Sequence, residues 1–179
     1  MKRNLLYLPF VLLVLCSGTF LLSQTRARDG DSRKFKLTPI VKVSTSKNPT
    51  MDAARLNVNL LMDGKLPDDG WRSTWTAWFK VDPVVTFDLG LDKKIGIIRI
   101  YFQTTDRADE FADVKVEVSR DGKQFVTFNE YEGFVTEKGK GAWAEVDLRV
   151  VNARYFRLSP KFQGWGHLWG EVEFWEIVN

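Results

Sequence analysis

Apolar and polar residues alternate along several short stretches of this chain. The valines within Val114–Val118 alternate with polar neighbours, and the apolar residues within Ile98–Phe102 repeat the pattern. A period of two residues places successive side chains on opposite faces of a strand, and it does not fit a helix. Both stretches are therefore predicted to be β-strands with one face turned toward a core.

Eight runs rich in β-branched and aromatic residues follow one another, separated by turn residues, which is typical of an antiparallel β-sandwich. The Asp-Gly pair within Arg120–Lys123 predicts a tight hairpin turn. Only Asn48–Met62 has a helical pattern, enough for a turn or two. The predicted fold class is all-β, and its strands are residues 37–43, 84–89, 95–102, 114–119, 125–131, 142–148, 155–158 and 170–177.

The first residues have the pattern of an export signal. A basic start is followed by the apolar run Leu5–Leu22 and by small residues near position 25. Residues 1–27 are predicted to be a cleaved signal peptide, with an uncleaved membrane anchor or a lipid on Cys16 as alternatives. Residues 28–36 are predicted to be a polar tether and residues 37–179 the folded domain, secreted or held at the cell envelope.

Charge and cysteine content exclude several classes of function. The formal net charge is +3, but Lys2, Arg3 and Arg26 lie in the predicted leader, which has no acid, so the remaining chain is neutral. A neutral domain has no global basic field for nucleic acid. Cys16 is the only cysteine, so the domain has no internal disulfide, no thiolate nucleophile and no cysteine-ligated metal.

Motifs along the chain resemble, in order, those of the discoidin or F5/8 type C family, which includes the family 32 carbohydrate-binding modules. The resemblance extends over about residues 55–177. It implies an eight-stranded, galactose-binding-like jelly-roll sandwich that binds sugars, phospholipid head groups or proteins through loops at one end. The segments that carry it are Leu61–Gly64, Trp71–Ser73, Val85–Gly90, Ile97–Ile100, Val114–Lys123, Ala153–Leu158 and Gly170–Trp175.

Three carboxylates, Asp63, Asp68 and Asp69, crowd one loop, as the oxygen ligands of a hard cation do. By resemblance, Glu171 on the last strand would complete a calcium (Ca²⁺) site with a structural role. The loop departs from the family pattern, because Pro67–Gly70 replaces the usual threonine and adds one residue before the tryptophan. The alternative is that these acids are ordinary solvated turn residues.

Trp165 lies between two glycines, which would expose its ring to a ligand. An aromatic ring suits the apolar face of a pyranose, and neighbouring polar side chains would bind its hydroxyl groups. A tryptophan folded back onto the sandwich is the alternative. The sugar site predicted in this way consists of Trp165, His167, Arg72, Trp78 and Gln163, with Trp78 and Trp75 in a second wall.

Catalysis is not expected. His167 is the only histidine, and the sequence has no Gly-x-Ser-x-Gly elbow, His-Glu-x-x-His motif or phosphate-binding glycine loop. The acids of residues 106–113 are interpreted as solvated, although paired carboxylates can cleave glycosides. The predicted function is therefore non-catalytic binding of a glycan. The alternative is adhesion to a protein or a membrane surface through exposed Trp165 and Phe134.

Overall fold

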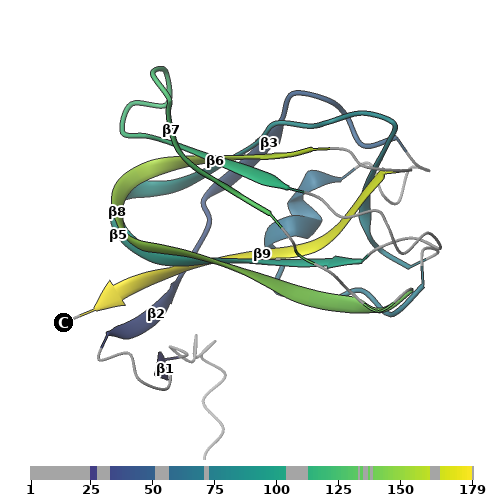
Figure 1. The fold of residues 1–179 in the computed structure, drawn as a ribbon, viewed down its shortest axis with the longest axis horizontal. Coiled ribbons are helices and arrows are strands. Elements are labelled where there is room, and N and C mark those ends of the chain that lie inside the picture. The colour runs from purple at the N-terminus through teal and green to yellow at the C-terminus, as the bar shows by residue number, and fades with distance from the viewer. Residues whose placement is uncertain are drawn as a thin grey trace, which may run out of the picture.

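The computed structural model describes residues 33–50, 57–70, 73–103, 113–132, 134, 137, 139–161 and 166–178, and the backbone of 25–27. Almost every described element is a β-strand, and all strand pairs are antiparallel (Figure 1). The elements are β1 (Thr25–Ala27), β2 (Lys34–Thr38), β3 (Lys42–Thr45), the 3₁₀ helix η2 (Val58–Met62), β4 (Thr76–Phe79), β5 (Val85–Gln103), β6 (Val114–Ser119), β7 (Val126–Tyr131), β8 (Gly141–Pro160) and β9 (Gly166–Val178).

The predicted all-β sandwich is confirmed, with differences in how the strands are divided. Each of the long strands β5 and β8 joins two of the predicted runs, whereas the run at residues 37–43 is divided between β2 and β3. Strand β4 escaped prediction because Thr76, Ala77 and Trp78 are all fully buried, so the strand has no polar face. Without alternation, a four-residue strand leaves no periodic signal.

The strands form two layers that enclose one core (Figure 1). One layer contains β3, β6, β7, the start of β5 and the end of β8. The other contains β2, β4 and β9 with the end of β5 and the start of β8. The Phe174 ring lies 5.3 Å from that of Phe87 and 5.1 Å from that of Phe156, so aromatic packing joins the layers.

Strands β5 and β8 pass from one layer into the other by bending together. The register between them shifts between Asp88 and Lys93 and again between Ile95 and Ile97. Gly90 has a φ of 79° in this bend, and Arg149 has a φ of 57°. The Asp147 Oδ1 atom accepts a hydrogen bond of 2.7 Å from the Arg149 N–H, which holds this left-handed residue. We call this bend, residues 89–96 and 147–154, the closed end.

The predicted hairpin is present between β6 and β7, beside the closed end. Gly122 has a φ of 71°, a conformation that favours glycine. The Asp121 carboxylate accepts hydrogen bonds from the backbone N–H groups of Lys123, at 2.9 Å, and Gln124, at 3.0 Å. These bonds lower the pKa of Asp121 to about 2. Arg120 forms an ion pair of 3.6 Å with Asp92 of the bend and so connects the hairpin to it.

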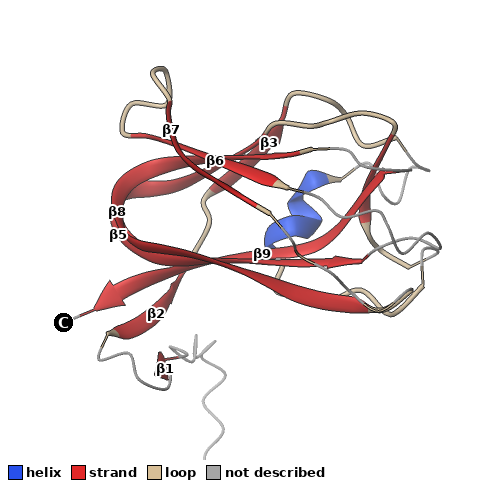
Figure 2. Cartoon of the chain, viewed as in Figure 1, coloured by secondary structure: helices blue, strands red, loops and turns tan. Residues whose placement is uncertain are grey.

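At the opposite end of the sandwich, β5 ends, β6 and β9 begin, and β8 both begins and ends (Figure 1). Strand pairing brings the end of β5 at Gln103 beside Gly141, the start of β8, and the start of β6 at Val114 beside Pro160, the end of β8. Strand β9 also begins here, at Gly166. Helix η2 packs between the layers, with Leu61 in the core (Figure 2). We call this the open end.

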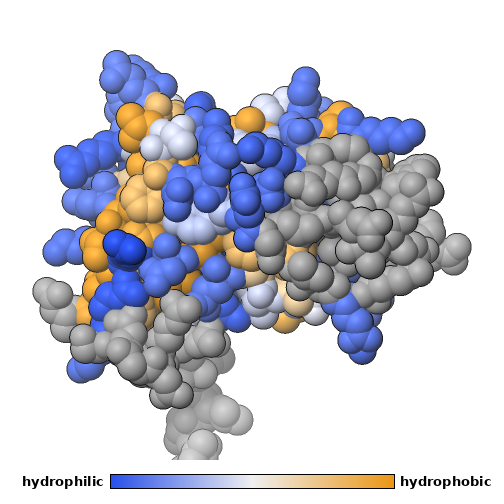
Figure 3. All heavy atoms as spheres, viewed as in Figure 1, coloured by the Kyte–Doolittle hydropathy of each residue, from blue (hydrophilic) through white to orange (hydrophobic). Residues whose placement is uncertain are grey.

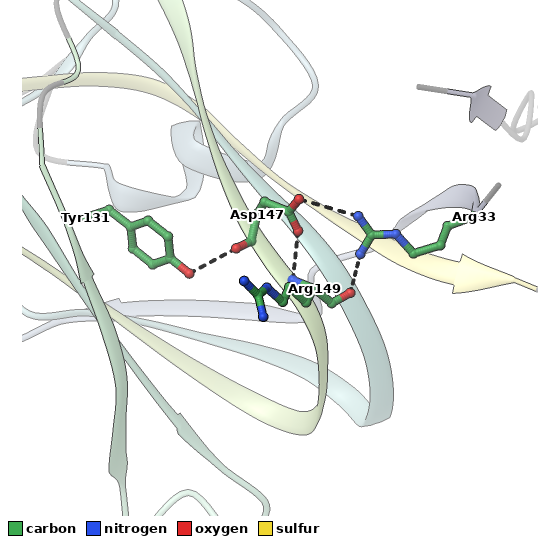
Figure 4. A network of polar contacts seen from close by, with 4 residues as sticks. All are labelled: Arg33, Tyr131, Asp147 and Arg149. Carbon is green, nitrogen blue, oxygen red and sulfur yellow. Dashed lines mark hydrogen bonds and ion pairs between the residues drawn. The ribbon is translucent and has the colours of Figure 1, made fainter. Parts of the chain in front are cut away.

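The chain enters the sandwich near the closed end. The Arg33 guanidinium contacts the Asp147 carboxylate at 3.4 Å and also donates to the Arg149 carbonyl oxygen (Figure 4). The Tyr131 hydroxyl donates to the Asp147 carbonyl oxygen at 3.1 Å, so β7 joins the same network. Strand β2 pairs with β9 from Lys34 onward. Residues 34–36, assigned above to the tether, are therefore part of the sheet.

The predicted leader lies outside the described residues except for the backbone of β1, which pairs with β2. Within the part of the chain that the structure describes, no helix has both the length and the apolar character needed to cross a membrane. Cleavage, anchoring and lipidation of residues 1–27 remain predictions.

Candidate functional site

The acidic loop 63–70 lies against β9 because the Pro67 ring packs directly on Gly170. Pro67 is buried, and a Cβ atom placed on Gly170 would lie 2.5 Å from the Pro67 Cδ atom. Only glycine at position 170 lets the proline ring come this close to the strand. The contact aligns the loop with β9, and the Gly64 N–H donates a hydrogen bond of 3.1 Å to the Glu171 Oε2 atom.

Glu171 is a buried acid with little to offset its charge. The residue is 6% exposed, and among the described residues no cationic side chain forms an ion pair with it. Burial, with a smaller contribution from the nearby Asp63 carboxylate, raises the pKa of Glu171 to about 8 against the lowering effect of the Gly64 hydrogen bond. A bound cation would remove this penalty, so the Asp63–Glu171 pair suits a hard, oxygen-seeking metal ion.

The four carboxylates predicted as ligands do not converge. Asp69 Oδ1 accepts a hydrogen bond of 3.0 Å from the Gly141 N–H, and the Asp68 carbonyl oxygen accepts one of 3.2 Å from the Trp75 indole. Within the described ranges, no three His, Cys, Asp or Glu side chains come together as a metal site would require. Of the predicted set, only Asp63 lies near Glu171. The Asp69 carboxylate binds the start of β8 instead, and Asp68 contributes its backbone oxygen to Trp75.

Trp78 is a core residue, which corrects its assignment to the wall of a sugar site. It is fully buried, and its indole N–H donates a hydrogen bond of 2.9 Å to the Lys47 carbonyl oxygen. Its ring contacts that of Trp169 edge to face, with the centroids 6.0 Å apart. Trp75 is fully buried as well. Neither ring is available to stack on a sugar in this structure.

His167 lies directly opposite Trp78 in the pairing of β9 with β4. It is only 4% exposed, and its Nε2 atom lies 3.2 Å from the Asp82 Oδ1 atom. Burial lowers the pKa of His167, while the Asp82 carboxylate opposes that shift. The structure therefore places His167 beneath the open end rather than on its surface.

His167 gives the fold a defined pH dependence. Because its pKa is lowered on folding, the unfolded chain takes up the proton first as the pH falls below about 6.5. The contribution of His167 to the free energy of unfolding should therefore fall between pH 7.5 and 5.5, and level off once the folded histidine is also protonated, so the wild type should lose stability relative to His167→Gln over this range. Urea unfolding of the wild type and of His167→Gln over this range measures the effect. An equal pH slope in both proteins would contradict the prediction.

Trp165, Arg72 and Gln163 lie outside the described residues, and their roles remain predictions. The described neighbour Gly166 has a structural reason to be glycine, since a Cβ atom there would lie 2.8 Å from the Phe79 ring and would also meet the Trp78 carbonyl oxygen. This glycine therefore allows β9 to approach β4, whatever it does for Trp165. Phe134 is half-buried and packs against the core.

An aromatic wall that was not predicted from the sequence lies on the outer side of the sheet near the open end. Tyr101 stacks on Trp75 with centroids 5.4 Å apart and contacts the Trp143 ring at 5.2 Å. The Arg99 guanidinium lies 4.2 Å from the Trp143 centroid and forms an ion pair of 2.9 Å with Glu173. Tyr101 and Trp143 are half-buried. The sequence signal was that both lie on outward positions of alternating strands, but only their register pairs them.

Comparison with known families identifies the family to which the chain belongs. The sequence profile of the F5/8 type C domain matches residues 41–174, which is most of the 179-residue chain and includes both layers of the sandwich. The chain belongs to the F5/8 type C domain family. The resemblance drawn from the sequence motifs is thereby confirmed. No curated protein sequence matches the chain.

Solved structures share the F5/8 type C fold at low identity. Truncated AlyQ, with CBM32 and alginate lyase domains, is 16% identical with a TM-score of 0.59, covering 81% of this chain and 34% of that one. CpGH89CBM32-5 from Clostridium perfringens, in complex with GalNAc-β-1,3-galactose, is 15% identical (TM-score 0.56; 77% and 98% covered). A mutant of the lectin binding domain of Lectinolysin, complexed with Lewis b, is 22% identical (TM-score 0.57; 75% and 91% covered). This chain thus spans about a third of truncated AlyQ.

Within this F5/8 type C domain, the acidic loop, the buried histidine and the aromatic wall all lie toward the open end. Each is held by β9, which pairs with β4 and β5 and carries His167 and Glu171. Strand β9 thus connects all three features to the sheet. Binding residues are commonly found on loops positioned by such a scaffold.

Proposed function

We propose that this protein is a non-catalytic, extracytoplasmic module that binds a glycan at the open end of its sandwich. The single observation that carries the proposal is the family match over both layers, joined to solved relatives that were captured with sugars. Fold alone does not assign a ligand, so the proposal depends on what the open end offers.

The open end offers aromatic and polar groups of the kinds that sugars need. Strand β9 begins there at Gly166, directly after Trp165 in the sequence, and the half-buried Tyr101 and Trp143 stand on the adjoining strands. Aromatic faces bind the C–H surfaces of a sugar ring, and directed hydrogen bonds fix its hydroxyl groups. We assign the stacking to Trp165, with Arg72 and Gln163 as hydrogen-bonding partners. The buried His167 and Trp78 would support the site from below without touching the sugar.

We also propose a structural calcium ion between the acidic loop and β9. The support is the buried Glu171, whose charge the described part of the structure leaves uncompensated, beside Asp63. These two carboxylates would hold the ion, and backbone carbonyl oxygens and water would supply the remaining ligands that calcium requires. The ion would neutralise the buried acid and fix the loop against the strand, with no part in any reaction.

Glycan-array binding of the 28–179 fragment, followed by titration with the best sugar, tests the main proposal. All three hydrophobic clusters lie within residues 35–177, so the fragment retains the whole core. Trp165→Ala should weaken binding at least about tenfold, equivalent to about 1.4 kcal/mol, without lowering the melting temperature. The control is Leu66→Ser, at an exposed apolar position in the acidic loop 63–70. A folded fragment that binds no glycan would refute the proposal.

A further inference from the structure

Two large apolar side chains project into solvent at the closed end, away from the proposed sugar site. Leu91 is 69% exposed and Val150 is 56% exposed. Both belong to the stretches where the register between β5 and β8 shifts, so neither is a regular outward position of a flat strand. Irregularities of this kind redirect side chains. Single exposed apolar side chains are common on protein surfaces, so the meaning of these two apolar tips depends on the charges beside them.

Cationic side chains accompany these apolar tips. Lys94, Lys123 and Arg149 are exposed, and no ion pair joins them to any acid of the described residues. Three acids of this region form ion pairs, Asp88 with Arg154 at 2.7 Å, Glu176 with Lys93 at 3.2 Å and Asp92 with Arg120 at 3.6 Å. The exposed Asp121 offsets one of the three cations, so a net positive charge remains. Figure 3 shows hydrophobic surface between hydrophilic groups at the bend. The closed end therefore combines apolar tips with unneutralised positive charge.

At the open end, the exposed acids of the described residues outnumber the exposed lysines Lys47, Lys65 and Lys80, while Lys140 and Lys161 pair with Glu137 and Glu130. These acids belong to the loops at residues 63–69 and 80–84 and to the end of β7, namely Asp63, Asp68, Asp69, Asp82 and Glu132. Because the chain after residue 27 is neutral as a whole, the separation of charge between the ends is a feature of the fold. A molecule charged in this way orients its closed end toward an anionic surface.

We propose that the closed end is a docking face for an anionic lipid bilayer. Leu91 and Val150 enter the interfacial region, while Lys94, Lys123 and Arg149 lie among the lipid phosphates. Apolar tips flanked by cations suit a bilayer, because a soluble polyanion would use the charges and leave the apolar groups in water. The chain also enters the fold here, at Arg33, from the side of the apolar run Leu5–Leu22 in the sequence. Docking by this face leaves the open end pointing away from the membrane.

Cosedimentation of the 28–179 fragment with vesicles tests this face without the apolar run. The fragment should bind vesicles of phosphatidylglycerol and phosphatidylcholine and not vesicles of phosphatidylcholine alone, and added salt should weaken the binding. Leu91→Ser/Val150→Ser should lower the partition coefficient about tenfold or more, because both apolar contacts are lost. Arg149→Asn should lower it about fivefold, since each cation near the surface contributes a comparable amount.

Matched substitutions at the open end distinguish binding by the closed end from non-specific adsorption of the protein to vesicles. Lys80 has the same left-handed backbone as Arg149, with a φ of 58°, so Lys80→Asn is the control for Arg149→Asn. Leu66→Ser is the control for the apolar pair. Both controls should keep wild-type partitioning, and all closed-end variants should keep wild-type glycan binding and melting temperature. The proposal is overturned if the fragment ignores anionic vesicles, if controls and closed-end variants lose binding alike, or if the apolar substitutions change nothing.

Discussion

Replacement of Trp78 by alanine should destabilise the domain by about 3–5 kcal/mol. The side chain is fully buried among the core residues of both layers, and removal of the indole leaves a cavity that the surrounding strands cannot close. It also leaves the Lys47 carbonyl oxygen without the donor that it has in the wild type. Since a domain of this size has a total stability of about 5–15 kcal/mol, much of the variant should unfold at moderate temperature.

Urea unfolding and glycan titration together separate the two roles that Trp78 was given. Trp78→Phe, which keeps an aromatic ring but loses the indole N–H, should lose clearly less stability than the alanine variant and should bind glycan as the wild type does. If Trp78→Ala instead kept wild-type stability and lost only sugar binding, Trp78 would have to lie at the ligand surface, against its position in the core.

Calcium should raise the melting temperature of the 28–179 fragment by about 5–10 °C at about a hundred times its dissociation constant. Binding to the folded state alone contributes about 2.7 kcal/mol at that concentration, and about 2–4 °C accompanies each kcal/mol in domains of this size. Chelator should reverse the rise. Glu171→Gln should remove the response, because the neutral amide no longer draws the cation into a buried site.

The neighbouring acid Glu173 supplies the control for this experiment. It lies two residues further along β9 and pairs with Arg99 at 2.9 Å, so Glu173→Gln should keep the calcium response. In the absence of metal, Glu171→Gln should melt higher than the wild type near pH 8, since it no longer buries a carboxyl group that ionises at that pH. A fragment whose melting temperature is the same in calcium and in chelator would end the calcium proposal.

The candidate site shows where sequence reasoning was sufficient and where it failed. The Asp63–Glu171 pairing was expected only from the family resemblance, since 108 positions separate the two residues and no local pattern connects them. Trp78 was misjudged because tryptophans beside a polar threonine look alike whether they are displayed or buried. The aromatic wall escaped notice because Tyr101 and Trp143 meet only through the register of β5 and β8.

The sequence by itself determined the fold class, the hairpin at Asp121 and the family, because alternation, turn chemistry and ordered motifs are local properties that one chain displays. The tertiary structure alone decided that β5 and β8 each serve both layers, that Trp78 and His167 are buried, and that charge is divided between the two ends. These features depend on which strands lie side by side and on which face of the sheet is covered. The pairing of residues far apart in the chain sets both, so no local pattern contains them.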